Sequence, residues 1–228
     1  MSSKKTKAVI DDGFQPELVK DAEFEGIFEI PTLKKANLLD LPEGITPFSR
    51  RQEAPTENEA LGFFELDVRF ADLLRNPAKY VNLLRKFAAV ITPDCSLYRD
   101  APFAVQLCNI YRRQAMGHFW QRQGLNVLAL VRWGSPDTYT TKRFPEAAAF
   151  AGVPHKAPIV ISTYGCIKSR DDKYHFEAGL AECLGTLEPS VVLVHGAMPR
   201  GVFAPYEGNV EFRHYNDWIT RRKGGKNG

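Results

Sequence analysis

Residues 158–195 read PIVISTYGCIKSRDDKYHFEAGLAECLGTLEPSVVLVH, and this stretch decides the fold class. Its two ends, 158–163 and 191–195, are unbroken runs of mainly β-branched and apolar residues, a pattern typical of strands buried on both faces. Between them the pattern predicts a helix over 171–187 that stops before Pro189. A strand, a helix and a strand in this order predict two parallel strands joined by a crossover.

The same alternation of short apolar runs and helical patterns extends in both directions. Further strands are expected at 62–66, 88–92, 126–133 and 210–215. Asn76 with Pro77 predicts a helix through about Lys86, and Asp100 with Pro102 predicts a longer helix that stops at Gly124. The sequence therefore predicts an α/β fold with a mainly parallel sheet of about five to six strands and flanking helices, either open or curled into a partial barrel.

Each of the two long helices is expected to turn one apolar face toward the sheet, because apolar residues recur at intervals of three and four. In the helix over 171–187 these inward residues are Tyr174, Ala178, Ala181 and Cys183 or Leu184. In the helix after Pro102 they are Ala104, Leu107, Cys108, Tyr111, Ala115 and Phe119. Gln106, Asn109, Arg112 and Arg113 then fall on the flank or the back of that helix, where a solvated side chain is the default.

The chain divides into an irregular arm over 1–60, which prolines interrupt, a single α/β domain over 61–220 and a basic disordered tail over 221–228. The overall charge of +3 belongs to the two ends, since residues 8–220 carry 23 cations against 27 anions. The seven end cations are Lys4, Lys5, Lys7, Arg221, Arg222, Lys223 and Lys226. The net charge is therefore no sign that the folded domain reads nucleic acid.

The composition, 44% hydrophobic and 25% charged, is typical of a globular protein. No apolar run approaches the roughly 20 residues of a membrane span, so a cytoplasmic protein without a membrane partner is expected. The four cysteines form no C-x-x-C pair, and no metal site is predicted. Because glycine-rich phosphate loops and hydrolase motifs are also absent, the cofactor stays unknown, the oligomeric state stays unassigned, and whether the protein is an enzyme stays open.

Candidate site residues follow the carboxyl ends of the predicted strands, where ligands bind in parallel α/β proteins. Asp94 and Asp100 can divide acid and base roles or hold a divalent ion, although Asp94 can also be a turn residue and Asp100 a helix cap. His195 can act as a general base, or its ring can be satisfied by backbone groups. The expected ligand-binding residues are Tyr98, Arg99, Arg132, Trp133, Ser162, Thr163, Gly165 and Lys168.

Several ordered stretches resemble a known family. They are FFELD at 63–67, NPAKY at 76–80, TPDCSLYRDAP at 92–102, NIYR at 109–112, VRWG at 131–134 and STYGCIK at 162–168. They are similar to the domain of unknown function 4417, over approximately 27–215. The resemblance implies an origin in a phage, plasmid or bacterial mobile element and a cytoplasmic life. That family has no established reaction, so the resemblance implies no catalytic residue, and residues 134–157 depart from its pattern.

These observations favour a phage or mobile-element protein whose strand-tip cleft binds a nucleotide-like or phosphorylated ligand, with action on that ligand left open. In this hypothesis Arg132 and Lys168 anchor the anion, and Tyr98 or Trp133 forms a stacking wall. The alternative is a binding protein without chemistry that engages a host or phage protein or nucleic acid, in replication, host takeover or assembly. The basic ends would then carry nucleic-acid contacts, and the irregular arm would contact a neighbouring subunit.

Overall fold

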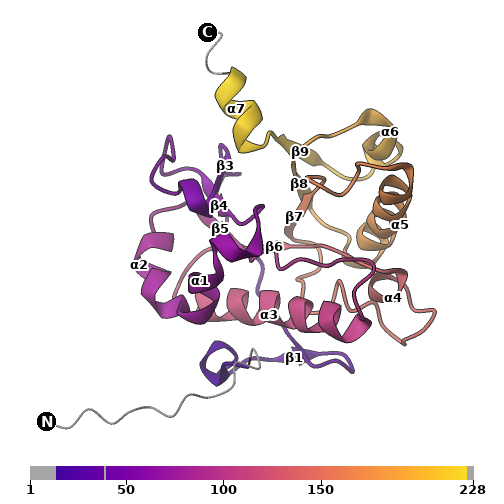
Figure 1. The fold of residues 1–228 in the computed structure, drawn as a ribbon, viewed down its shortest axis with the longest axis horizontal. Helices are drawn as coiled ribbons and strands as arrows, with labels where there is room; N and C mark the ends of the chain where they lie inside the picture. Colours follow the sequence, from indigo (N-terminus) through magenta and orange to yellow (C-terminus); the bar gives the residue numbers. More distant parts are fainter. Residues whose placement is uncertain (1–13, 39, 225–228) are drawn as a thin grey trace, which may run out of the picture.

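The computed structural model describes residues 14–38 and 40–224 and shows an α/β fold (Figure 1). Seven parallel strands form the main sheet, in the order β3-β4-β5-β6-β7-β8-β9. They are β3 (Ile45–Pro47), β4 (Ala60–Gly62), β5 (Ala89–Ile91), β6 (Val127–Leu130), β7 (Pro158–Ser162), β8 (Val191–His195) and β9 (Phe212–Tyr215). A separate antiparallel pair, β1 (Phe24–Glu25) and β2 (Ile30–Pro31), lies beside the long helix α3 (Phe103–Arg122).

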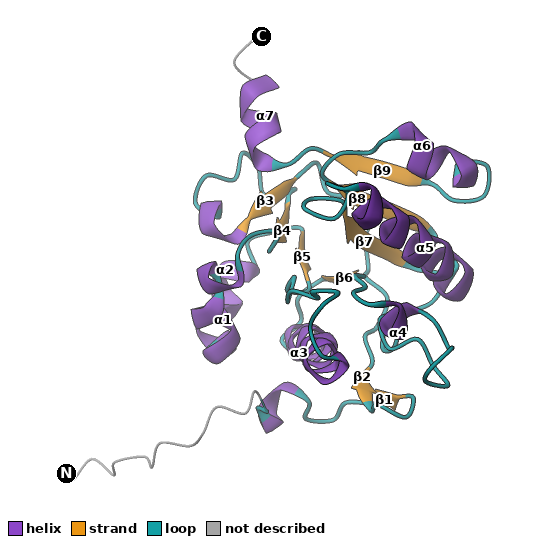
Figure 2. Cartoon of the chain, turned by 45° about the vertical axis from the view of Figure 1, so that its right-hand side comes forward, coloured by secondary structure: helices purple, strands orange, loops and turns teal. Residues whose placement is uncertain are grey.

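The order of the strands in the sheet is their order along the chain, so each strand is joined to a parallel neighbour by a crossover. Crossovers of one hand place every connecting helix on the same face of a sheet. The sheet consequently curls into a half-barrel with helices outside and strand tips around an uncovered concave side (Figure 2). This geometry resolves the choice between an open sheet and a partial barrel, and it brings distant loops together at one rim.

The helices cover the convex face. In Figure 1, α1 and α2 lie on one side, α3 runs along the lower edge and α4, α5 and α6 lie on the other side. Their bounds are α1 (Ala71–Arg75), α2 (Val81–Leu84), α4 (Pro136–Tyr139), α5 (Arg170–Leu187), α6 (Arg200–Phe203) and α7 (Trp218–Gly224). Short 3-10 helices are η1 (Pro16–Leu18), η2 (Phe48–Arg50), η3 (Asp67–Arg69), η4 (Pro77–Tyr80) and η5 (Ala204–Tyr206). No helix in the described part of the chain is long and apolar enough to cross a membrane.

Strand β8 shows how the sequence builds both faces of the sheet. Val192 and Val194 pack outward against the cluster that includes α5, whereas Val191 and Leu193 belong to the inner cluster. His195 continues the inward series, because successive side chains of a strand point to opposite faces. The inner face is therefore apolar at its base and polar at its carboxyl rim.

The strands differ from their predicted positions near the start of the sheet. Ile45–Pro47, inside the segment expected to be irregular, forms β3 and pairs with β4, which raises the strand number above the expected five to six. The expected strand at 62–66 lies earlier, at Ala60–Gly62. A Cβ on Gly62 would come within 2.7 Å of Ile45, so the glycine lets β3 approach closely there.

The two long helices, α3 and α5, are correctly placed, but their buried faces differ from the expected ones. In α5, Tyr174 is 66% exposed and Ala181 is exposed, while Phe176, Leu180, Cys183, Leu184 and Leu187 are buried. In α3, Ala104 and Cys108 are exposed, whereas Gln106 and Arg113 are each only 1% exposed. Polar side chains can enter this interface because loop backbones meet them: Gln106 donates to the carbonyl of Ala101 at 2.7 Å. The expected helix through Lys86 is split into η4 and α2.

Helix α7 includes Arg221, Arg222 and Lys223, which the sequence assigns to a disordered tail. Arg221 is held there because it donates to both carboxylate oxygens of Glu59 and, at 3.2 Å, to the carbonyl of Ile45 in β3. Glu59 is 1% exposed, so its charge needs this partner. The cations Lys4, Lys5, Lys7 and Lys226 lie outside the described residues.

Candidate functional site

A cavity of about 1240 Å³ opens at the carboxyl rim of the half-barrel. Its walls come from the tips of most strands of the main sheet, from the start of α5 and from the start of α7. Ligand cavities in proteins commonly span roughly 300–1,000 Å³, so the space is large enough for a ligand of nucleotide size.

The predicted site residues come together in this cavity, with one exception. The lining residues among them are Asp94, Tyr98, Arg99, Asp100, Arg132, Trp133, Ser162, Gly165, Lys168 and His195. Thr163 is not a lining residue, because its hydroxyl donates to the carbonyl of Ala197 at 2.6 Å and its N–H donates to that of His195. Thr163 instead joins the end of β7 to the end of β8, and its binding of a ligand stays a prediction.

Asp94 and Arg132 form a buried ion pair at the base of the cavity. The Nε and Nη2 atoms of Arg132 donate to the two carboxylate oxygens of Asp94, each at 2.5 Å. Its Nη1 donates to Sγ of Cys166 at 2.7 Å. Burial opposes the charge on Arg132, but Asp94 and Cys166 outweigh it and raise the pKa of the guanidinium. Asp94 is thus the counter-ion of Arg132. This pairing argues against the expectation that Asp94 acts as a free acid, a free base or a metal ligand.

A second guanidinium lies behind this pair. Arg113 of α3 is 1% exposed, its Nε has no hydrogen bond, and its other donors reach the carbonyls of Arg132 and Ala149 only at 3.5 and 3.4 Å. Burial lowers the pKa of Arg113 to about 10, still well above neutral pH, so the group is charged. No ion pair joins it to a carboxylate within the described residues. Arg132 and Asp94 therefore line the base of the cavity as an ion pair, and a second, unpaired cation is buried behind them.

The charges at the rim are mostly paired. Arg99 donates to Asp171 at 2.5 Å and to Asp172 at 2.7 Å, and Asp171 is the main reason that the pKa of Arg99 is raised. Arg99 therefore joins its loop to the first turn of α5, and its expected role in ligand binding stays a prediction. Lys168, by contrast, is exposed and makes no ion pair with any described residue. It is a cation available to a ligand.

Asp100 is exposed, and its side chain makes no hydrogen bond with the described residues. The cap position of α3 is Pro102, and no side chain caps this helix. The alternative in which Asp100 serves as a helix cap is therefore wrong, since the chain turns into the helix two residues later. Asp100 lines the cavity as an unpaired carboxylate.

His195 is 4% exposed and stacks on Phe64, with ring centroids 4.0 Å apart. Its Nδ1 lies 3.2 Å from the hydroxyl of Ser162, whereas its Nε2 has no partner within the described residues. Burial lowers the pKa of His195 to about 4, so the ring is neutral at pH 7. Phe64 follows β4 and His195 ends β8, so this stack closes the curl of the sheet.

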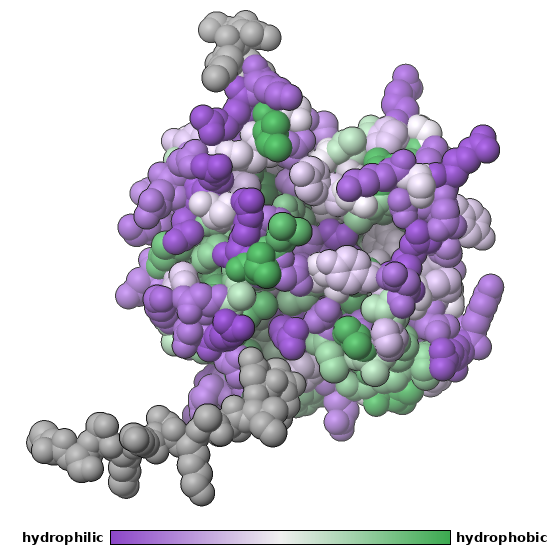
Figure 3. Space-filling model, in the orientation of Figure 1, coloured by the Kyte–Doolittle hydropathy of each residue, from purple (hydrophilic) through white to green (hydrophobic). Residues whose placement is uncertain are grey.

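Aromatic and apolar side chains surround the mouth of the cavity. Tyr98 is 65% exposed and Tyr164 is 52% exposed, and both line the cavity with Leu66 and Ile219. Figure 3 shows apolar side chains standing among hydrophilic ones in the middle of this face. Trp133 is held more firmly, because its Nε1 donates to the carbonyl of His175 in α5 at 3.2 Å.

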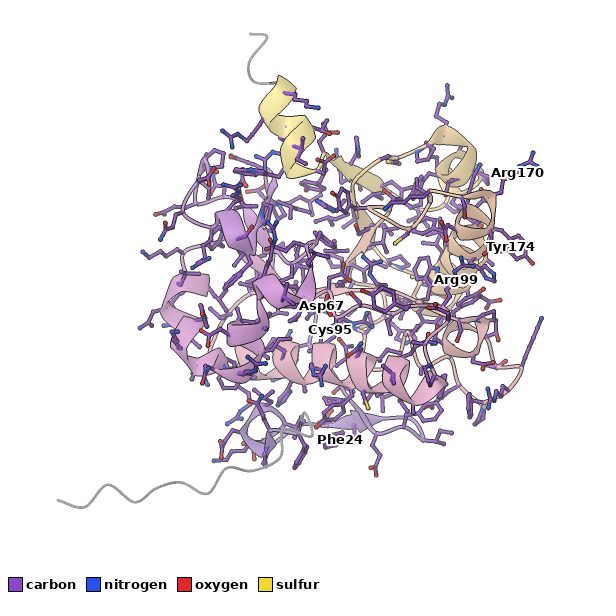
Figure 4. All side chains as sticks on the ribbon, in the orientation of Figure 1. Phe24, Asp67, Cys95, Arg99, Arg170 and Tyr174 are labelled. Carbon is purple, nitrogen blue, oxygen red and sulfur yellow. The ribbon has the colours of Figure 1, made fainter. Side chains whose placement is uncertain are left out.

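Hydrogen bonds to Asp67 fix the loop that carries Asp94 and Tyr98. Asp67 accepts hydrogen bonds from the hydroxyl and the N–H of Ser96, at 2.8 and 3.3 Å. Cys95 is buried beside it, and burial raises the pKa of its thiol to about 12, so this cysteine is not a reactive thiolate. Figure 4 shows Asp67 and Cys95 near the middle of the molecule and Arg99 beside α5, whose Arg170 and Tyr174 lie on its outer side.

The lining residues that the sequence prediction missed include Phe64, Glu65 and Trp218. The first two fell inside an expected strand, and Trp218 stands next to an expected tail, so no strand-tip argument reached them. The missing signal for Phe64 and Glu65 was the end of β4, which lies at Gly62 and not at the expected residue 66. Within the described residues, no three histidine, cysteine or acidic side chains gather as a metal-binding group.

Fold and cavity together define an α/β half-barrel protein with a ligand-sized site at its strand tips. The chain belongs to the family described as "domain of unknown function (DUF4417)", whose model matches residues 22–216. It is 33% identical over 174 residues to the Gene 1 protein of Mycobacterium phage D29, covering 75% of this chain and 61% of that protein. It is 29% identical over 177 residues to the Gene 1 protein of Mycobacterium phage L5, covering 77% of this chain and 74% of that protein. No solved structure was found to match it.

Proposed function

We propose that this phage-related protein binds an anionic ligand, a phosphorylated small molecule or a nucleotide-like group, in the strand-tip cavity. The observation that carries the proposal is a charge imbalance at and behind the base: Arg132 is paired with Asp94, whereas the buried Arg113, which does not line the cavity, has no carboxylate partner within the described residues. An uncompensated charge in a protein interior costs several kcal/mol. A bound anion offsets that cost, and Arg132 is accessible to one because 17% of its side chain is exposed.

Lys168 supports the same proposal from the rim. It stands in the loop after β7, between the exposed Tyr164 and the first turn of α5. The first turn itself does not attract an anion, because the carboxylate of Asp172 already accepts the N–H of Ser169 in a capping box. The ligand's charge is therefore expected between Lys168 and Arg132, away from the acidic start of the helix.

Titration of the full chain with inorganic phosphate, followed by calorimetry and by thermal unfolding, tests the proposal. Phosphate is expected to bind and to raise the unfolding temperature, less so at high salt. Lys168→Ala should weaken binding by about two- to fivefold, as expected for an exposed cation. Lys142→Ala, an exposed lysine outside the cavity, is the matched control.

A double variant tests the base of the cavity. Asp94→Asn with Arg132→Gln removes both charges together, so neither partner is left buried alone. The folded double variant should lose most of its phosphate binding. Unchanged affinity in this variant, or no phosphate binding by the unaltered chain, would falsify the proposal.

The alternative, engagement of a host or phage protein or of nucleic acid, stays a prediction. Its tail-based form is weakened by the structure, since Arg221 is committed to Glu59 and Arg222 lies 3.7 Å from Glu53. The exposed side chains of Leu66, Tyr98 and Ile219 at the mouth are what a protein partner would cover. Light scattering over a wide concentration range separates self-association from a monomer that binds small ligands.

A further inference from the structure

Cys166 places a thiol in the cavity wall, in the loop between β7 and α5. The residue is half-buried and lines the cavity, so its sulfur is open to small molecules that enter there. Nη1 of Arg132 donates to Sγ of Cys166 at 2.7 Å. A cation bonded to a cysteine sulfur stabilises the thiolate, which is the nucleophilic form of the side chain. This contact therefore favours reactivity at Cys166.

The other three cysteines lack this combination of access and charge. Cys95 and Cys183 are buried, and burial raises the pKa of both thiols. Cys108 is exposed on α3, but no cation is bonded to its sulfur among the residues that the structure describes. The chain thus offers two enclosed thiols, one accessible thiol without a cation and one accessible thiol beside a guanidinium.

A second group on the same wall is available to a small polar molecule. His195 is 4% exposed and lines the cavity, and its Nε2 has no hydrogen-bond partner within the described residues. This nitrogen is not among the fully buried atoms without a partner, so it is open to the cavity. Tyr164 connects it to Cys166, because the two rings lie 6.2 Å apart and the carbonyl of Tyr164 lies 3.6 Å from Sγ. Burial is the largest cause of the lowered pKa of His195, and the nearby charge of Arg132 adds to it.

We propose that Cys166 is a modification site, at which hydrogen peroxide oxidises the thiolate to a sulfenic acid. Sγ attacks one oxygen of the peroxide, an S–O bond forms and the O–O bond breaks. The other oxygen leaves as hydroxide and takes up a proton to give water. The sulfur loses two electrons and the peroxide gains them. Nε2 of His195 supplies a hydrogen-bonding group for the small polar reactant on the same wall.

Oxidation of Cys166 also changes the site proposed for the anion. Arg132 and Lys168 are expected to hold the charge of the anion, and Cys166 contacts the first and precedes the second by two residues. The added oxygen of a sulfenic acid therefore takes up space beside the guanidinium, where the anion is expected. Oxidation should weaken phosphate binding, and bound phosphate should slow oxidation. This effect on binding rests on the proposed function, whereas the oxidation itself does not.

The test treats the folded, full chain at pH 7 with hydrogen peroxide and dimedone, which traps sulfenic acids. Mass spectrometry then gives the labelling rate of each cysteine. Cys166 is expected to be labelled about tenfold faster than Cys108, because thiolate character and exposure together set the rate. Cys95 and Cys183 should stay unlabelled while the chain is folded. Labelling of Cys166 that is no faster than that of Cys108 overturns the proposal.

Two variants test the role of the guanidinium. Asp94→Asn with Arg132→Gln removes the cation without leaving a buried charge alone, so Cys166 should then be labelled about as slowly as Cys108. Arg132→Lys keeps a cation and should retain most of the difference between the two cysteines. The rate at Cys108 is the internal control and should not change, and labelling of Cys95 reports any unfolding. An unchanged rate at Cys166 in the folded double variant overturns the proposal.

Phosphate titrations before and after peroxide treatment separate the two proposals. Oxidation should weaken phosphate binding by about three- to tenfold. Peroxide should not alter phosphate affinity in Cys166→Ser, whereas Cys108→Ser, the matched control, should respond as the unaltered chain does. Fast oxidation of Cys166 in a chain that binds no phosphate overturns the proposed function and supports the modification site. Phosphate binding by a chain whose Cys166 reacts as slowly as Cys108 does the reverse, and undiminished affinity after oxidation overturns the position of the anion beside Cys166.

Discussion

Asp94→Asn is the substitution whose effect the structure defines most sharply. Asp94 and Asp100 lie six residues apart in one loop region, and both line the cavity, yet only Asp94 is paired. Asparagine keeps the size of the side chain and one acceptor but removes the charge. Arg132 then stays buried with its other neighbours and without its counter-ion.

The expected size of the effect follows from burial. The side chains of Asp94 and Arg132 are 9% and 17% exposed, and two hydrogen bonds of 2.5 Å join them. Breaking a buried pair by removing one partner costs about 3–5 kcal/mol, and the retained acceptor favours the lower end, about 3 kcal/mol. For a domain of this size, that loss lowers the unfolding temperature by roughly 6–12 °C.

Urea unfolding, followed by tryptophan fluorescence, measures the change, with Asp100→Asn as the matched control. The control should alter the free energy of unfolding by less than about 0.5 kcal/mol, because the carboxylate of Asp100 is exposed and unpaired. Phosphate should restore more stability to Asp94→Asn than to the unaltered chain, since the variant carries one more uncompensated cation. Loss of less than about 1 kcal/mol in Asp94→Asn, or an equal loss in both variants, would refute this account.

Three further predictions concern stability. Because the folded pKa of His195 is about 4 and its ordinary value is 6.5, the unfolded chain takes up this proton first as pH falls. Through this group, the free energy of unfolding should therefore drop by about 3 kcal/mol between pH 6.5 and a pH below 4. His195→Gln should remove that part of the pH dependence when the free energy of unfolding is measured across the acid range. Arg221→Gln should lower the free energy of unfolding by about 3–5 kcal/mol, because the buried carboxylate of Glu59 loses its cation. Gly44→Ala should act through the same pair, because its Cβ would stand 2.6 Å from the guanidinium of Arg221. A double-mutant cycle in which the two effects add fully would contradict that link. Arg99→Ala, at a pair about one-third exposed or more, should change the free energy of unfolding by no more than about 1 kcal/mol in the same urea assay, and a loss above 2 kcal/mol would show that the loop depends on it.

The α/β class, the parallel sheet and the rim at the strand tips could be predicted because each follows from local pattern. A buried parallel strand needs a run such as Pro158–Ser162, and a crossover helix needs one apolar stripe. The strand-tip rule then gathers residues from distant loops without any knowledge of side-chain contacts. That is why ten of the eleven candidate residues line one cavity.

Only the tertiary structure decides which charged side chains are paired and which are not. Asp94 and Asp100 are alike in sequence context, but the loop places one against Arg132 and turns the other to solvent. Gln106 and Arg113 are polar, and only the loop carbonyls that meet them in space explain their burial. Periodicity reports which residues share a helix face, whereas hydrogen bonds between segments decide which face is buried.

The sequence by itself determined that the chain folds as an α/β protein, where most of its strands lie and which loops share a rim, because these depend on spacing along the chain. The curl of the sheet, the stack of Phe64 on His195 and the closing position of α7 depend on contacts between residues more than a hundred positions apart. Such contacts leave no periodic trace in the chain. They shape the cavity in which the proposed function takes place.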